Sequence, residues 1–260
     1  MTNRSVVVAI DGSATAERAI SWAAAEAASL GTPLRLVHAF AWPLAAVPRR
    51  RGEIDPALVE VADQVISRSR EIAQELEPDL DVEAGRIPGF LTPVMIEESR
   101  HAQLLVIGSR GLTGALGTMT CSTALDLAAA AYCPIVVIRP DHGRRTGGPV
   151  VVGHDGSPAS TAALALGTDY AERHHAVRRV VNDCRPAEEL LRQSIEAQLI
   201  VLGARGCGGF EGQLLGSVSQ TVLHQASCPV AVIPPAAINR QLPVGGPQPL
   251  GILSAAADFG

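Results

Sequence analysis

The chain has 260 residues, 47% of them hydrophobic and 18% charged, with a formal net charge of −5. This length fits one or two domains with a sizeable core, and the acidic balance without a basic stripe argues against a nucleic-acid partner. No run of about 18 apolar residues is free of Pro, Gly and charge, so we expect no membrane span. The five cysteines lack CxxC spacing, which is typical of free thiols in the cytoplasm.

Two parts of the chain repeat each other. VVVAIDGS at 6–13 resembles VVVGHDGS at 150–157, an offset of 144 residues. VIGSRG at 106–111 resembles VLGARG at 201–206, an offset of only 95 residues. We therefore predict a tandem repeat. Its second copy is shorter by 49 residues, the difference between the two offsets.

Strands and helices alternate along the first copy. Apolar periodicity and cap signals predict strands at 6–10, 34–40, 81–86, 104–107 and 135–138. They predict helices at 15–30, 56–77, 91–100 and 121–131, with a loop at 43–54. This alternation is typical of a parallel sheet with helices on both faces, so we predict an α/β, doubly wound fold.

The second copy is incomplete. It has predicted strands at 150–154, 177–181, 199–202 and 230–233 and helices at 158–174, 186–195 and 217–226. Strand two and the helix after it are missing, so either strand three moves beside strand one or a gap remains. We predict a complete domain at 1–140, a linker at 141–149, a truncated domain at 150–234 and a disordered tail at 235–260.

A glycine-rich segment follows strand four of each copy, where parallel sheets bind ligands. Gly203 and Gly206 can take positive φ and let the main chain approach a ligand. Gly216 precedes a helix whose free N–H groups suit phosphate oxygens. Asp11 and Asp155 end strand one of their copies, where a carboxylate can accept hydrogen bonds from ribose.

The spacing of the second copy is G-x2-G-x9-G-[ST], without the lysine of a Walker A loop and without a GxGxxG fingerprint. Glycines alone are also compatible with a flexible loop. Their place after strand four, with Asp-Gly-Ser after strand one in both copies, favours phosphate binding.

Together these motifs resemble the universal stress protein family. The resemblance rests on AIDGS at 9–13, GHDGS at 153–157, IGSRG at 107–111, LGARG at 202–206 and GSVSQ at 216–220, with AYCPIVVI and ASCPVAVI near the ends of the copies. It implies five parallel strands in the order 3-2-1-4-5, two domains paired along strand five, and cytoplasmic action. One branch of the family binds ATP through the glycine motif, whereas another lacks the motif and binds no nucleotide.

The resemblance also implies the ligand-binding residues. In the first copy they are Ala9, Asp11, Val37, Gly108, Gly111, Cys121, Ser122 and Thr123. In the second copy they are Asp155, Gly203, Gly206, Gly216, Ser217 and Val218. Cys121 replaces the third glycine of the first copy, and the sulfur would crowd a phosphate. The second copy lacks the wall beside adenine, so we expect the first copy to hold the more complete pocket.

Other polar residues point to structural roles. We interpret Ser13 and Ser157 as helix caps and His154 as a histidine at the rim of the sheet. His174 and His175 end a helix, where they suit its dipole better than a metal. No histidine is placed as a base for a serine, so we expect no catalytic site. No HxxxH or HExxH pattern appears, so we expect no metal site either.

We therefore predict a cytoplasmic, ATP-binding regulator of the stress response, with Mg²⁺ as the candidate counterion of ATP. It would be no enzyme, or at most a very slow ATPase. Its expected partners are ATP, the other domain of the chain, a second copy in a homodimer and an unidentified regulated protein. The alternatives are a scaffold that binds no nucleotide and an enzyme of the wider adenine-nucleotide α-hydrolase-like group.

Overall fold

The computed structural model describes residues 4–40, 56–109, 120–139, 147–183, 185–208 and 215–238. Its strands are β1 (Val6–Ala9), β2 (Leu34–Phe40), β3 (Val82–Pro88), β4 (Leu104–Gly108), β5 (Ile135–Ile138), β6 (Val150–Gly153), β7 (Arg178–Val181), β8 (Leu199–Gly203) and β9 (Val230–Ile233). Its helices are α1 (Ala14–Leu30), α2 (Pro56–Leu76), α3 (Leu91–Glu98), α4 (Thr120–Ala130), α5 (Pro158–Arg173), α6 (Pro186–Ser194), α7 (Ser217–Gln225) and α8 (Pro235–Ile238).

The predicted strands at 34–40, 135–138 and 230–233 are confirmed with the same bounds. The predicted tail, in contrast, begins with the short helix α8, in which Ala237 is buried at 2% exposure. Pro235 at its first position suits a helix start, because that residue needs no N–H donor. The predicted loop at 43–54, most of the predicted linker and residues 239–260 lie outside the described residues.

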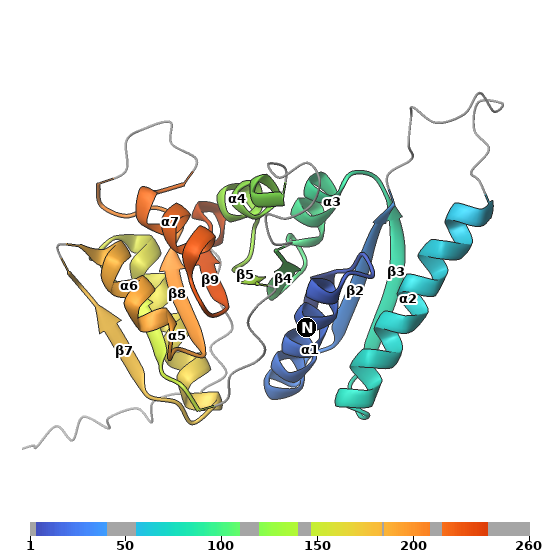
Figure 1. Ribbon diagram of the computed structural model, residues 1–260, viewed down its shortest axis with the longest axis horizontal. Helices are drawn as coiled ribbons and strands as arrows, with labels where there is room; N and C mark the ends of the chain where they lie inside the picture. Colours follow the sequence, from blue (N-terminus) through green and yellow to red (C-terminus); the bar gives the residue numbers. More distant parts are fainter. Residues whose placement is uncertain are drawn as a thin grey trace, which may run out of the picture.

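All the described strands form one sheet, in the order β3-β2-β1-β4-β5-β9-β8-β6-β7. The first copy has the predicted order 3-2-1-4-5, and the copies join where β5 runs antiparallel to β9. This confirms the expected pairing along strand five. Both strands are buried along their whole length, so each would otherwise leave an apolar edge unpaired. Figure 1 shows the join in the middle of the molecule, with α2 and β7 near opposite ends.

Strand β7 lies in the place of the missing strand two. It pairs in parallel with β6, so Val181 lies opposite Gly153. In the first copy, Val37 of β2 lies opposite Ala9 of β1 in the same way. Of the two outcomes left open by the sequence, the shift of strand three beside strand one is therefore the one realised, and the sheet has no gap.

Helices cover both faces of the sheet and enclose two apolar cores. One core packs strand residues such as Val6 and Val8 against α1, α2, α5 and α8. The other packs residues such as Val7 against α3, α4, α6 and α7. Neighbouring strand residues point to opposite faces, which explains this division. Each core contains residues of both copies, so the join between the copies is part of the hydrophobic interior.

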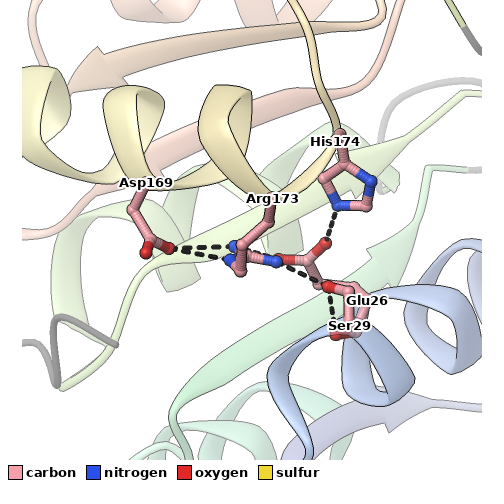
Figure 2. Close-up of polar contacts among 5 residues, drawn as sticks. All are labelled: Glu26, Ser29, Asp169, Arg173 and His174. Atoms are coloured by element: carbon pink, nitrogen blue, oxygen red, sulfur yellow. Dashed lines mark hydrogen bonds and ion pairs between the residues drawn. The ribbon is translucent and has the colours of Figure 1, made fainter. Parts of the chain in front are cut away.

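A buried polar cluster connects helix α1 of the first copy to helix α5 of the second (Figure 2). Glu26 of α1 is only 3% exposed. Its Oε1 accepts a hydrogen bond from Arg173 Nη2 at 2.7 Å, and its Oε2 lies 2.8 Å from His174 Nε2. Trp22 and Tyr170 stack across the same two helices with ring centroids 6.0 Å apart. His174 thus contacts a carboxylate of the other copy, a partner that we did not expect from its place at a helix end.

Candidate functional site

The Asp-Gly-Ser turns at 11–13 and 155–157 each end a strand and start a helix. Their glycines have left-handed main chains, with φ of 76° in the first and 84° in the second, which glycine adopts without strain. The aspartate Oδ1 accepts a hydrogen bond from the serine N–H at 2.9 Å in the first turn and 3.0 Å in the second. The serine hydroxyl then accepts from Ala16 N–H or Ser160 N–H. Both serines are therefore helix caps, as predicted.

A pocket of about 220 Å³ lies in the second copy, beyond the ends of β6, β7 and β8 and beside the start of α7. It brings together all the residues that the resemblance implied for this copy: Asp155, Gly203, Gly206, Gly216, Ser217 and Val218. Apolar side chains on its wall include Val181, Leu190 and Leu202. The wall that the missing strand two would supply is thus formed in part by β7 and α6.

Asp155 holds the glycine loop against the end of β6. Its Oδ2 accepts a hydrogen bond from Cys207 N–H at 2.7 Å. Burial alone would raise the pKa of Asp155, but hydrogen bonds from Ser157, Cys207 and Ser160 outweigh this effect and lower it to about 2. The carboxylate is therefore ionised at neutral pH. It accepts from two main-chain N–H groups and, with about four lone-pair sites, has capacity for further donors.

Gly203 and Gly206, the first two glycines of the motif, allow close packing and do not have a left-handed main chain. The described residues with positive φ do not include Gly203 or Gly206, which corrects our expectation for both. A Cβ on Gly203 would lie 2.6 Å from Ala159 Cβ, and one on Gly206 would lie 2.1 Å from Asp155 Oδ2. In the first copy, a Cβ on Gly108 would lie 2.9 Å from the main chain of Thr15. The missing side chains let helix and loop approach the strand ends.

The third motif glycine, Gly216, precedes helix α7. Its φ is −70°, and its N–H donates to Ala204 O at 2.9 Å. A Cβ there would find its nearest atom at 3.5 Å, an ordinary contact. The position therefore does not demand glycine in the second copy. The first turn of α7 is further fixed by Ser219, whose hydroxyl donates to Gly203 O at 2.7 Å.

Only part of the predicted site of the first copy lies within the described residues. Ala9 lies opposite Val37 at the ends of β1 and β2, and Asp11 and Gly108 follow at the same edge of the sheet. Helix α4 begins at Thr120, so position 121 lies within the helix and not before it. Thr123 is half-buried in that helix. Gly111 and the side chains of Cys121 and Ser122 lie outside the described residues.

Further pocket residues were not singled out as ligand-binding from the sequence: Asn182, Asp183 and Arg205. The first two reach the pocket only because β7 lies beside β6, which no local pattern indicates. Arg205 stands between the first two motif glycines, a position that itself could have drawn attention to it. His154 also lines the pocket, with Nδ1 3.1 Å from Ser160 Oγ, in agreement with a rim histidine.

The described residues include neither a candidate metal site nor a helix suited to crossing a membrane. No group of three or more His, Cys, Asp or Glu side chains in this part of the chain is arranged to hold a metal ion. None of the described helices is both long enough and apolar enough to cross a membrane.

Comparison with known proteins identifies the family. The sequence profile of the universal stress protein family matches residues 2–139 and 175–234. The chain belongs to this family. A universal stress protein of Mycobacterium tuberculosis is 31% identical to it over 87% of this chain and 96% of that protein.

Solved structures are similar as well. A solved universal stress protein of Archaeoglobus fulgidus aligns with 90% of the present chain and over 99% of its own length. The TM-score is 0.68 and the sequence identity is 16%, which supports the fold. A second protein of that organism, solved in complex with dAMP, covers 53% of this chain with a TM-score of 0.41 and 24% identity.

Proposed function

We propose that this universal stress protein binds ATP in the pocket of its second copy and acts as a cytoplasmic regulator of the stress response. The observation that carries the proposal is the convergence of Asp155 and the whole G-x2-G-x9-G-[ST] motif on one pocket. The motif's resemblance to the ATP-binding branch of the family supports the choice of ligand. The sequence favoured the first copy instead, but the glycine segment of that copy lies outside the described residues.

The pocket offers a suitable group for each part of the nucleotide. Val181 and Leu202 offer apolar surface for the base. The ionised Asp155 can accept hydrogen bonds from ribose hydroxyls with its remaining lone pairs. The N–H groups in the first turn of α7 have no partner within the helix, and with the Ser217 hydroxyl they suit phosphate oxygens. Mg²⁺ would accompany the phosphates, since it is usually bound through them.

We propose binding without efficient catalysis. The His154 imidazole in the pocket lies against the Ser160 hydroxyl, which donates its own proton to Ser157 O at 2.9 Å. This arrangement holds the imidazole in the wall and provides no evident base for an attacking water. At most very slow ATP hydrolysis is expected. A homodimer and a regulated protein complete the proposed role.

The two Asp-Gly-Ser turns provide the test of site and ligand. In calorimetric titrations with ATP, Asp155→Ala should weaken binding about tenfold or more, the effect of losing a hydrogen bond to a charged group. Asp11→Ala removes the same side chain from the matching turn of the first copy and should change the affinity less than about twofold.

The possible results separate the alternatives. A larger loss in Asp11→Ala would return the site to the first copy, as the sequence suggested. Absence of saturable ATP binding by the wild-type protein would reject the proposal and favour the scaffold that binds no nucleotide. Rapid, substrate-dependent ATP turnover would instead favour an enzyme.

A further inference from the structure

Strand β7 forms an edge of the sheet in the second copy. It lies at one end of the strand order, and the described residues contain no strand on its outer side (Figure 1). Val177 O and Val181 O accept hydrogen bonds at 2.8 Å and 2.9 Å from N–H groups at the start of β6 and just past its end. Alternate residues of a strand direct their main-chain groups to opposite sides, so those of Arg178 and Val180 point away from β6. These groups can pair with a further strand.

The first copy shows what lies on the outer side of the corresponding strand. There β2 is flanked by β3, and the two strands pair in parallel along their whole length. Arg35 of β2 lies opposite Glu83 of β3, with Arg35 Nη1 3.2 Å from Glu83 Oε2. Arg35 Nε also donates to Glu98 of α3 at 2.6 Å. The strand outside β2 thus supplies a carboxylate to an arginine of β2.

Arg179 of β7 is the counterpart of Arg35. Arg35 lies opposite Val7 of β1, whereas Arg179 lies opposite Val151 of β6. Val7 and Val151 are equivalent residues of the repeat, 144 positions apart, and both belong to the same hydrophobic core. The two arginines therefore occupy matching places on the same face of the sheet.

The carboxylates of the first copy have no counterpart around Arg179. The described residues contain no strand outside β7 that could carry an equivalent of Glu83. The counterpart of Glu98, 95 positions later, is the neutral Gln193. Glu196 Oε2 lies 3.9 Å from Arg179 Nη1, but the side chains are 75% and 49% exposed, and such a pair contributes little. Arg179 is therefore available to a carboxylate on an added strand.

The charge of β7 favours an acidic segment over a second copy of this chain. Arg178 and Arg179 are neighbours on this edge, so two β7 strands side by side would bring the arginines of both chains together. Short edge strands with such charges resist pairing with themselves. An acidic segment converts the same charge into an attraction. Val180, which is 46% exposed, adds apolar surface beside the arginines.

We propose that the edge of β7 binds an extended acidic segment of a partner protein, which adds a parallel strand in the place that β3 holds in the first copy. A carboxylate of this segment pairs with Arg179 as Glu83 pairs with Arg35. Strand addition at a sheet edge draws affinity from main-chain hydrogen bonds and specificity from side chains. Arg178, Arg179 and Val180 do not line the nucleotide pocket. The inference therefore goes beyond ATP binding and gives the proposed regulated protein a surface.

The probe is a fluorescein-labelled peptide with the sequence of residues 79–89, the segment that contains β3. Fluorescence anisotropy should show saturable binding to the full-length protein, in which β3 already covers the edge of β2. Arg179→Gln should weaken binding about two- to fivefold, and Arg179→Glu about tenfold or more, because it places like charges opposite each other. The matched control is Arg18→Glu, the same change at an exposed arginine of α1, which should alter binding less than about twofold.

Two variants of the peptide separate strand addition from simple charge attraction. In the first copy Asp81 O accepts from Leu34 N–H at 2.9 Å, so the main-chain groups of Gly85, four positions later, also face β2. Gly85→Pro in the peptide keeps every charge but removes this donor, and it should weaken binding at least about fivefold. Glu83→Arg in the peptide should weaken binding to the wild type and restore binding to Arg179→Glu. A merely structural role of Arg179 would not give this restoration.

Equal affinity of the wild type and Arg179→Glu, or unchanged binding of the Gly85→Pro peptide, would overturn the inference. Absence of saturable binding would also overturn it, because the edge would then be closed to an added strand. Analytical ultracentrifugation tests the second copy as the occupant. A wild-type dimer that the peptide dissociates would assign the edge to a second copy and reject the acidic partner.

Discussion

Gly203 shows why one residue type is needed at the end of β8. Helix α5 starts so close to this strand end that a Cβ on Gly203 would lie 2.6 Å from Ala159 Cβ and 3.0 Å from its carbonyl carbon. The nearby main chain cannot yield as a flexible side chain would. The glycine is therefore a packing requirement, and it also brings the Asp-Gly-Ser turn and the glycine-rich loop after β8 to the same pocket.

This requirement predicts different outcomes for two glycines of the same loop. Gly203→Ala should lower the free energy of unfolding by about 1–3 kcal/mol, because α5 must move or the main chain must distort. Gly208→Ala should stay within about 0.5 kcal/mol, since no atom of the described residues lies within 4 Å of the added Cβ. Urea denaturation measures both, and equal losses would contradict the packing explanation.

Among the helices, α1 and α5 are joined by an ion pair that is largely withdrawn from water. Burial opposes ionisation of Glu26, but hydrogen bonds and charge interactions with His174 and Arg173 outweigh it, so its pKa is lowered from 4.5. Arg173 also pairs with Asp169 at 3.0 Å and donates to Ser29. The cluster thus fixes the contact between the two copies on this face of the sheet (Figure 2).

Glu26→Gln should destabilise the protein at neutral pH by about 3 kcal/mol, because it removes the buried carboxylate that contacts both Arg173 and His174 and leaves Arg173 with Asp169 alone. The lowered pKa of Glu26 means that its ionisation stabilises the fold above the unfolded-state pKa of 4.5. This contribution is lost as the pH falls through the lower pKa of the folded state. Denaturation at several pH values should therefore show a weaker acid dependence in the variant.

Glu17→Gln is the control, since Glu17 is exposed on the same helix. It should change stability by less than about 0.5 kcal/mol. A loss in Glu17→Gln as large as that in Glu26→Gln would mean that the buried pair has no special role.

At the scale of the molecule, the tandem copies form one folding unit. A single sheet runs through both, and each hydrophobic core contains residues from both. Removing one copy would expose β5 or β9 along a buried apolar edge. The copies are therefore expected to unfold together, although each has its own repeat of the sequence.

Calorimetry should accordingly show one unfolding transition, coincident with the loss of far-ultraviolet circular dichroism. Leu105→Ala removes a fully buried side chain of β4 in the first copy and should cost about 2–5 kcal/mol. The single transition should move to lower temperature as a whole. A second transition that stays at the wild-type temperature would show that the copies unfold independently.

The resemblance to the universal stress protein family implied the strand order of the first copy and the glycines of the pocket. The repeat and the alternating strands and helices could be predicted directly from the sequence. These two features depend on local periodicity, caps and motifs, which involve residues only a few positions apart. Ser13 and Ser157 are examples, because each caps the helix that begins directly after it.

Only the tertiary structure decided where β7 lies, why Gly203 and Gly206 carry no side chain, and which partners Glu26 has. Each depends on atoms brought together from distant parts of the chain, as in the contact between Glu26 and Arg173. A local pattern shows that a residue is buried or ends a strand. It does not show what fills the space opposite, because that is set by the packing of the whole sheet and its helices.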